Sequence, residues 1–442
     1  MQWIFMVGMA LMLGGGLLSA QERLTFDQCV AESLRESESL RSVEASIDAA
    51  QADADSTFWS FFPTASINVS YLKLYFEPEP EGLAMPSIPG FDLSGAFDMP
   101  EWSRTLDITV AQPVTPLWSV WKGHDAQTMA REIEEIKKRS TADQIRVKAA
   151  EYFYSYLMIE RLDALLADTV KQLDRYETQA QNFVDAGLTD KRAVLKVKLE
   201  KARLEKERQT VAGNRTLLKR ALALLMNRDM ESFAPFSESP DEIAPVPALD
   251  RLLALQDEHR AEIAMLDRAD LVASTLQDIA IQPLVPTIAL TGGYKHNFDA
   301  TTFSPEGTFF VGAVLSWDFG FDTMKQINSF KKARGEKTKM RLANIDVRKQ
   351  LRLQVTQLYT DLMVKEKEIA IATAEREVAA ENLRIEESKY QEKMTTETDL
   401  LAASLQERQA KTSYITAVFQ YKIALRKLAG TIGVPVSALT VN

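Results

Sequence analysis

The sequence has one cysteine, three histidines and no long apolar segment in its interior. The single cysteine, Cys29, excludes an intrachain disulfide. Past residue 20 no apolar run approaches the ~20 residues that a membrane-spanning helix needs, so membrane insertion would have to use strands. The histidines fall on different predicted elements, without the spacing of a metal site, and no phosphate-binding loop or catalytic serine motif occurs. These absences predict a protein that is not an enzyme and that holds no cofactor or metal.

The charge balance excludes another class of partner. The formal net charge is −10 and charged residues make up 26% of the chain, which argues against a nucleic-acid partner. In the internal repeat described below, Cys29 falls opposite Leu252. This position predicts a buried thiol on a helix face, and a reactive thiol is the alternative.

The N-terminal segment 1–20 is the one apolar run. It is rich in glycine and ends in Leu-Leu-Ser-Ala before Gln21, which predicts a secretory signal peptide. An uncleaved N-terminal anchor stays open for two reasons. The segment has no Lys or Arg ahead of its apolar part, and Leu18 is larger than the residue usual at the −3 cleavage position.

The most informative feature that is present is an internal duplication. Residues 24–71 align without a gap on residues 247–294, at an offset of 223. Farther along, Arg220 falls on Arg426 at an offset of 206. A repeat of about 200 residues determines the architecture. The predicted organisation is a first repeat over 21–232, a Pro-rich connector over 233–247, a second repeat over 248–430 and a tail over 431–442.

Each repeat is predicted to contain a helix, a strand pair, a very long helix and a final helix. Apolar residues in the long helices recur at the 4,3 spacing of a coiled coil, as in Ile145, Ala149 and Tyr152. At ~1.5 Å per residue each long helix would be on the order of 100 Å long. The predicted helices are 24–58, 121–185 and 189–227 in the first repeat, and 248–281, 322–392 and 395–429 in the second.

The predicted strands are apolar on one face and carry small polar residues on the other. They cover 64–74, 105–114, 287–297 and 308–318. This alternation is typical of a lipid-facing barrel wall around a wet lumen, with Asp107 and Lys295 facing the lumen, and it also occurs in soluble β-sandwiches. Four tryptophans lie at the helix-side ends of the strands, as an interfacial aromatic belt would: Trp59, Trp118, Trp121 and Trp317.

Four strands cannot close a barrel, and open sheet edges cannot face lipid. The chain is therefore predicted to form an oligomer, because three copies supply twelve strands, enough for an aqueous passage. The long helices would continue from the barrel as a coiled-coil tube. The fold class is thus mainly α with β, internally duplicated. The acidic segment 75–103 is expected to be a solvated exterior loop, and a cation filter or a partner epitope stays open there.

The residues resemble the TolC-like outer-membrane efflux protein family, also called outer membrane factors, over nearly the whole chain after residue 20. Leu24-Thr-Phe-Asp-Gln-Cys-Val-Ala resembles the opening helix of that family. Phe62-Pro63-Thr64 and Val285-Pro286-Thr287 resemble the helix-to-strand transitions of the family. The tunnel-tip turn resembles Asp185-Ala-Gly187-Leu188 in the first repeat, and Tyr390 with Asp399 matches the turn of the second.

This resemblance implies a homotrimer with a twelve-stranded outer-membrane β-barrel and a periplasmic α-barrel. It also implies partners, namely a periplasmic adaptor protein, an inner-membrane pump of the RND or ABC type, and outer-membrane lipid. The chain would then be a passive exit duct of a tripartite efflux or type I secretion system in a Gram-negative cell. The alternative from the residues alone is a periplasmic structural coiled-coil protein with a small soluble β domain.

The resemblance also implies a gate at the periplasmic tip. Asp399 matches an acidic position of the family's pore constriction, and Glu397 lies two residues earlier. Thr395 and Ala193 occupy positions where polar or charged residues lock the closed tip. A ring of Asp399 carboxylates would attract cations. The second interpretation of Asp399 is a residue that favours the start of its own helix.

Overall fold

The computed structural model describes residues 22–73, 75, 102–229, 233–234, 246–299, 305–317 and 320–439. The predicted signal peptide, nearly all of the acidic loop 75–103 and most of the connector 233–247 lie outside these residues. In chain order the elements are β1 Glu22–Arg23, α1 Phe26–Arg35, α2 Glu38–Trp59, β2 Thr64–Lys73, β3 Trp102–Pro113, α3 Leu117–Asp185, α4 Arg192–Leu225, β4 Phe233–Ala234, α5 Leu249–His259, α6 Ala261–Ile279, the 3-10 turn Gln282–Leu284, β5 Thr287–Asn297, β6 Gly307–Ser316, α7 Phe321–Gln391, α8 Glu397–Ile432 and α9 Val436–Leu439.

The predicted helices 24–58 and 248–281 are each broken in two, and the single-helix prediction was wrong there. The breaks fall at Ser37 and Arg260, which are equivalent positions of the two repeats. At the first break the Ser37 hydroxyl accepts from the amide of Leu40 at 3.3 Å, so it starts a new helix. At the second, Arg260 is extended and buried, and its guanidinium bonds Gln354 at 2.6 Å. Tertiary contacts therefore stabilise the second break.

Other boundaries differ by a few residues. Strand β2 covers Thr64–Lys73 and β6 covers Gly307–Ser316, whereas the last residues of the two predictions, 74 and 318, lie outside the described residues. Strand β3 begins at Trp102, three residues early. Helix α3 begins at Leu117, ahead of the predicted 121, because no proline follows Pro116 to interrupt it. Trp118 and Trp121 are therefore helical residues, in the first turns of α3.

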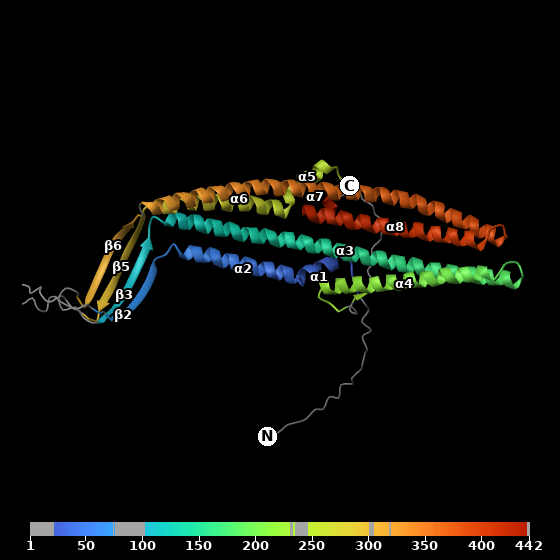
Figure 1. Ribbon diagram of the computed structural model, residues 1–442, viewed down its shortest axis with the longest axis horizontal. Helices are drawn as coiled ribbons and strands as arrows, with labels where there is room; N and C mark the ends of the chain where they lie inside the picture. Colours follow the sequence, from blue (N-terminus) through green and yellow to red (C-terminus); the bar gives the residue numbers. More distant parts are fainter. Residues whose placement is uncertain are drawn as a thin grey trace, which may run out of the picture. The chain divides into compact units, whose positions relative to one another are not determined.

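Strands β2, β3, β5 and β6 form an antiparallel sheet in the order β2-β3-β5-β6, which joins the two repeats edge to edge (Figure 1). The two-residue strands β1 and β4 pair separately, in parallel. The register places Ile67, Ile108, Tyr294 and Phe309 in one row across the sheet. The next row, on the opposite face, contains Asn68, Asp107, Lys295 and Thr308. One face is thus apolar and the other polar, as the alternation predicts. The two outer strands, β2 and β6, each have one paired neighbour among the described strands.

An ion pair holds the loop-side end of the sheet and also joins the two repeats. The guanidinium of Arg104, on β3, bonds both carboxylate oxygens of Asp299, beyond β5, with the shortest distance 2.6 Å. The backbone amide of Arg104 donates to the same carboxylate at 2.8 Å. A bidentate ion pair of this kind fixes the position of the turn after β5 more firmly than a single hydrogen bond would.

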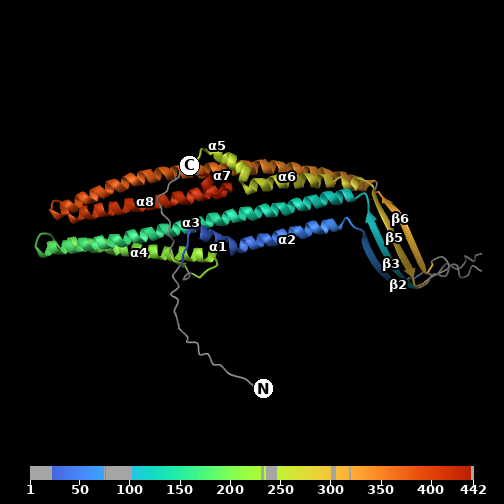
Figure 2. The same cartoon turned by 180° about the vertical axis from the view of Figure 1, so that it is seen from behind.

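The helices divide between two compact units. One comprises residues 22–41, 139–260 and 351–439 of the described chain, and the other comprises residues 42–138 and 261–350, with the sheet in the latter. In the first unit, α3 with α4 and α7 with α8 form two antiparallel hairpins (Figure 2). No described helix is long and apolar enough to cross a membrane.

The first unit has two hydrophobic clusters that bury equivalent residues of the two repeats. Cys29 and Leu222 are fully buried together with Phe153 in one cluster. Their counterparts, Leu252 and Leu428, are fully buried in the other. The prediction that Cys29 is a buried core residue is confirmed, and burial raises the pKa of its thiol to about 11. The thiolate needed for reactivity is therefore disfavoured.

The second unit has fewer buried residues, and polar contacts join its helices. His124 Nδ1 lies 3.0 Å from the carbonyl oxygen of Ala54. The amide of Asn344 donates to the carbonyl of Leu266 at 3.0 Å. An ion pair of 2.9 Å connects Arg268 to Glu132. Helices joined this way leave apolar side chains exposed, Leu276 and Leu342 among others.

Candidate functional site

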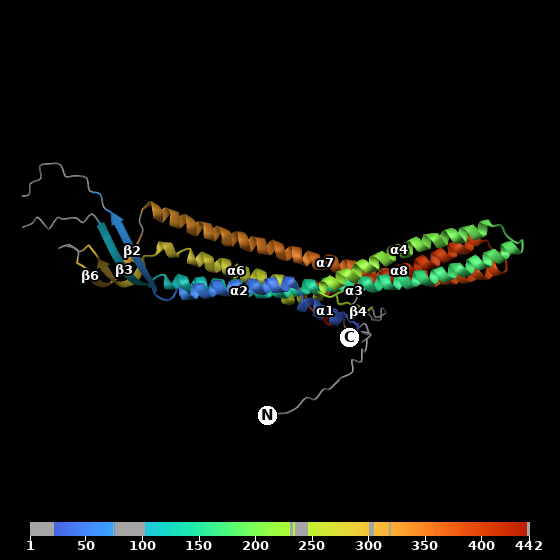
Figure 3. The same cartoon turned by 90° about the horizontal axis from the view of Figure 1, so that it is seen from below.

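The turns that end the two helical hairpins of the first unit form the candidate site, and both turns lie at the same end of the unit (Figure 3). After α3, Gly187 adopts φ +71 and its amide donates to the carbonyl of Val184 at 2.9 Å. The amide of Leu188 donates to the carbonyl of Phe183 at 2.8 Å. This left-handed C-cap needs a residue that tolerates positive φ, which explains the glycine.

After α7 the same turn is made without glycine. Lys393 adopts φ +60, its amide donates to the carbonyl of Tyr390 at 3.2 Å, and the amide of Met394 donates to Lys389 at 2.8 Å. Lys393 is the repeat counterpart of Gly187. A side chain with a Cβ is strained in this conformation, so the lysine carries a cost that its counterpart avoids. The sequence predicted the turn but not the strain.

Asp399 lies in the first turn of α8, and the cap of this helix determines its hydrogen bonds. Thr396 is the N-cap, and its hydroxyl accepts from the amide of Asp399 at 3.3 Å. The Asp399 carboxylate accepts in return from the Thr396 hydroxyl at 2.7 Å and its amide at 3.3 Å, and from the Thr395 hydroxyl at 3.2 Å. These bonds, those from Thr396 foremost, lower the pKa of the exposed carboxylate. Asp399 is therefore a helix-capping residue in the single chain. Its place in a pore constriction stays a prediction.

Glu397 bridges the two hairpins. Its carboxylate lies 3.0 Å from the ammonium of Lys196, on α4, and the same ammonium donates to the Thr398 hydroxyl at 2.7 Å. Ala193, which the resemblance placed at a locking position, is only 1% exposed and packs with Ala180. It makes no polar bridge because its methyl group belongs to the packed interior of the first hairpin.

A second bridge lies between the two long helices. The Tyr176 hydroxyl, on α3, donates to the carboxylate of Glu387, on α7, at 2.5 Å. Burial and this carboxylate both raise the pKa of the Tyr176 phenol, so the proton stays on the donor. The amide of Gln172 reaches the same carboxylate at 3.4 Å. Sequence reasoning missed this pair, since its two members are 211 residues apart and no local pattern connects them.

An aromatic contact lies beside the two turns, between the ends of α3 and α7. The ring of Tyr390 lies 5.5 Å from the ring of Phe183, and the ammonium of Lys393 lies 4.9 Å above Phe183. Tyr390 is 5% exposed, and burial is the main cause that raises the pKa of its phenol. The predicted turn residue Tyr390 thus packs across the two hairpins, and Lys393 adds a cation–π contact that offsets its strained backbone.

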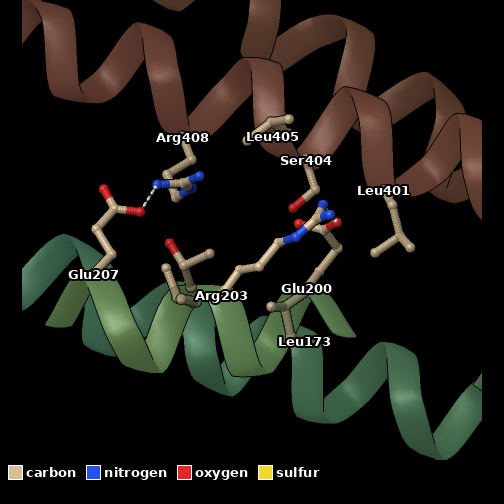
Figure 4. Close-up of a pocket in the computed structure, with 10 residues that line it drawn as sticks. Leu173, Glu200, Arg203, Glu207, Leu401, Ser404, Leu405 and Arg408 are labelled. Atoms are coloured by element: carbon tan, nitrogen blue, oxygen red, sulfur yellow. Dashed lines mark hydrogen bonds and ion pairs between the residues drawn. The ribbon is translucent and has the colours of Figure 1, made fainter. Parts of the chain in front are cut away.

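A shallow groove lies farther from the turns, among α3, α4 and α8 (Figure 4). The guanidinium of Arg408, on α8, bonds Glu207, on α4, at 2.6 Å across it. Leu173, Leu401 and Ser404 also line the groove. Its volume of about 40 Å³ is well below the ~300 Å³ of a ligand pocket, so the groove is a helix interface and not a substrate site.

The other predicted site residues belong to the second unit, which contains the sheet. The polar-face residues Asp107 and Lys295 are cross-strand partners, with their charged atoms 3.8 Å apart. Pro63 and Pro286 each precede the first residue of a strand, where a missing amide proton is tolerated. All four predicted belt residues are exposed: Trp59, Trp118, Trp121 and Trp317. No group of three described His, Cys, Asp or Glu side chains could hold a metal ion.

Solved structures with the same fold include proteins described as outer-membrane or transmembrane channels. The chain superposes on the outer-membrane channel OprN with a TM-score of 0.77 and 14% identity, covering 93% of this chain and 90% of that one. For the outer-membrane protein VceC of Vibrio cholerae the TM-score is 0.76 at 15% identity, covering 93% and 96%. For CusC, described as forming a transmembrane channel, it is 0.79 at 12% identity, covering 94% and 93%.

Sequence comparison alone gives no such match, since neither a protein-family model nor a curated protein matches the chain. The mostly helical fold with its four strands, however, was predicted from the residue patterns, agrees with the resemblance, and is confirmed. The chain has the fold of the outer-membrane channels that the TolC-like resemblance predicts.

Proposed function

We propose that three copies of this chain form an outer-membrane exit duct, a passive conduit that is gated at the hairpin turns and energised by an inner-membrane pump. The observation that carries the proposal is the sheet, which has one apolar face and, within the part of the chain that the structure describes, two unpaired edges. Val69, Phe309 and Val311 on the apolar face are 74%, 83% and 91% exposed. Exposed apolar strands with open edges need partners in water and in lipid alike. Three copies would supply twelve strands and remove every edge.

The helices supply a second argument for several copies. Four apolar residues of α7 stand exposed at seven-residue intervals: Val364, Ile371, Val378 and Ile385. A heptad row of this kind is the seam by which a helix packs on another helix. The row lies on the surface of the single chain, so a helix of a neighbouring copy is the partner we propose for it.

The proposed partners follow from the same architecture. OprN, VceC and CusC are described as outer-membrane or transmembrane channel proteins. By analogy the helical hairpins would extend into the periplasm and meet a periplasmic adaptor protein and an RND or ABC-type pump. The duct itself would supply no chemical energy.

The test of the proposed function is assembly and conductance of the full chain. We expect the protein to extract with outer membranes, to migrate as a detergent-stable trimer that dissociates on heating, and to conduct ions in planar lipid bilayers. Recovery in the soluble periplasm without detergent would contradict the proposal and favour the periplasmic coiled-coil alternative. A trimer that gives no conductance would retain the assembly and reject the duct.

Asp399 tests the proposed constriction. We expect Asp399→Ala to lower the cation preference of the open channel, measured from the reversal potential in a salt gradient. Thr396→Ala is the matched control, because it breaks the same helix cap and keeps the charge. A reversal potential that shifts equally in both variants would make Asp399 a capping residue only.

The same carboxylate predicts the pH dependence. The pKa of Asp399 is lowered in the folded chain, so the charge and its capping bonds persist above the usual aspartate pKa of ~3.9. Both are lost only as the pH falls through the lowered folded pKa. Wild-type cation preference should therefore stay constant from neutral pH to about pH 4, provided that Asp399 dominates it.

A further inference from the structure

A cavity of about 310 Å³ lies among α3, α7 and α8, away from the turns and within the first unit. Its apolar lining consists of Leu165 on α3 and of Ile415, Val418 and Phe419 on α8. Val418 and Phe419 are each 3% exposed, so this part of the lining belongs to the packed core and cannot easily collapse. The volume is at the lower end of the range for small-molecule pockets.

The rim of the cavity is positively charged. Arg161, Arg376 and Lys411 line it, and no carboxylate does. Lys411 already pairs with Glu407. Among the described residues, no carboxylate lies within ion-pair distance of Arg161 or Arg376, so two guanidinium groups have no anionic partner beside an apolar cavity. In a chain whose net charge is −10, such a local excess of positive charge stands out.

One of the two guanidinium groups is held in place. The central carbon of the Arg376 guanidinium lies 4.0 Å from the ring centroid of Tyr414, which also lines the cavity. Stacking of this kind restricts the long side chain while its N–H groups remain free to donate. A pre-positioned guanidinium loses less entropy when it binds an anion.

The internal duplication indicates that the fold does not require this cavity. At the offset of 206, the counterparts of Val418 and Phe419 are Ala212 and Gly213, and the counterpart of Arg376 is Val170. The first repeat thus forms the same hairpin without the counterparts of this lining or of the Arg376 guanidinium. The cavity depends on residues that the second repeat carries and the first lacks, so it needs an explanation other than helix packing.

We propose that this cavity binds an amphipathic organic anion, with an alkyl chain of about ten carbons on the apolar lining and a carboxylate bonded by Arg161 and Arg376. Bound there, the ligand would connect α3 of the first hairpin to α7 and α8 of the second. The site is formed by residues of one chain, so it does not depend on the proposed duct.

Calorimetric titration of the full chain, kept soluble in amphipol, tests the site with three probes of equal chain length. Decanoate should bind, while decanol and decyltrimethylammonium should bind at least about tenfold more weakly, which corresponds to ~1.4 kcal/mol. The double variant Arg161→Gln/Arg376→Gln should lose about tenfold in affinity for decanoate. Arg384→Gln should not, although it removes the same charge from α7, because Arg384 is paired with Glu381 at 2.7 Å outside the cavity.

Three results would overturn the proposal. Equal binding of decanoate and decanol would reduce the effect to apolar partitioning. Equal affinity of the double variant and the wild type would remove the guanidinium groups from the site. Absence of saturable decanoate binding would reject the site itself. Conductance of the double variant should match that of the wild type, so a failure of the duct and a failure of the site remain distinguishable.

Discussion

Replacement of Tyr176 by Phe together with Lys196 by Ala is expected to raise the conductance of the reconstituted protein several-fold. The two substitutions remove the bridges that join the hairpins near their turns, Tyr176 to Glu387 and Lys196 to Glu397. A hydrogen bond to a charged group contributes about 1.5–3 kcal/mol, and a half-exposed ion pair contributes close to zero. A loss of ~2 kcal/mol would favour separation of the hairpins by about 30-fold in each protomer.

The control for this variant removes similar groups without touching the bridges. Tyr359→Phe with Lys171→Ala deletes a hydroxyl on α7 and an ammonium on α3. Among the described carboxylates, Lys171 pairs with Asp168 of its own helix and with no other. The control should conduct like the wild type in planar bilayers. Equal conductance of both double variants would show that the bridges do not hold the tip closed.

Gly293→Ala is expected to abolish the detergent-stable trimer that we propose. A Cβ at Gly293 would lie 2.2 Å from the carbonyl oxygen of Ile108 on the neighbouring strand and 2.8 Å from the ring of Phe310. Overpacking of a core costs about 1–3 kcal/mol where side chains can shift. A backbone oxygen within the sheet ladder cannot shift without breaking the pairing of β3 with β5, so a larger effect is expected here.

Gly312→Ala is the matched control, because it lies in the same sheet and a Cβ there would meet nothing within 4 Å. It should retain the heat-dissociable band on gels. Far-ultraviolet circular dichroism of Gly293→Ala should still report the helices, which lie outside the strand ladder. A stable Gly293→Ala trimer would mean that the strands adjust in the assembly.

The repeated order of helices and strands could be predicted from the sequence. The duplication, the 4,3 spacing of apolar residues in the helices and their alternation in the strands can all be read directly along the chain. The strand Thr287–Asn297 agrees with its prediction at both ends. Gly187 lies in the predicted turn after the first long helix. The break at Arg260 could not be predicted, since its burial and its bond to Gln354 depend on a helix far away in the sequence. The same holds for the Tyr176–Glu387 bridge, whose members are 211 residues apart.

The candidate site was predicted less completely than the fold. The spacing Thr396-x-x-Asp399 in the sequence is a capping signature, and these two residues form a capping box at the start of α8. The pore role of Asp399 depends on neighbouring copies and stays a prediction. The cationic cavity combines residues of three helices, and no local pattern connects Arg161 to Arg376.

The two unpaired edges of the sheet have a consequence for kinetics. The hairpins can fold within one chain, so their formation should be first order and independent of concentration. Strands β2 and β6 each have one paired neighbour among the described strands. Under the proposed assembly their free edges pair with other copies, so this step should accelerate with protein concentration. Dilution during refolding should therefore separate the two processes in time, with a helical monomer that accumulates first and retains two adhesive edges. Chains arrested at that stage would be the ones most prone to aggregate.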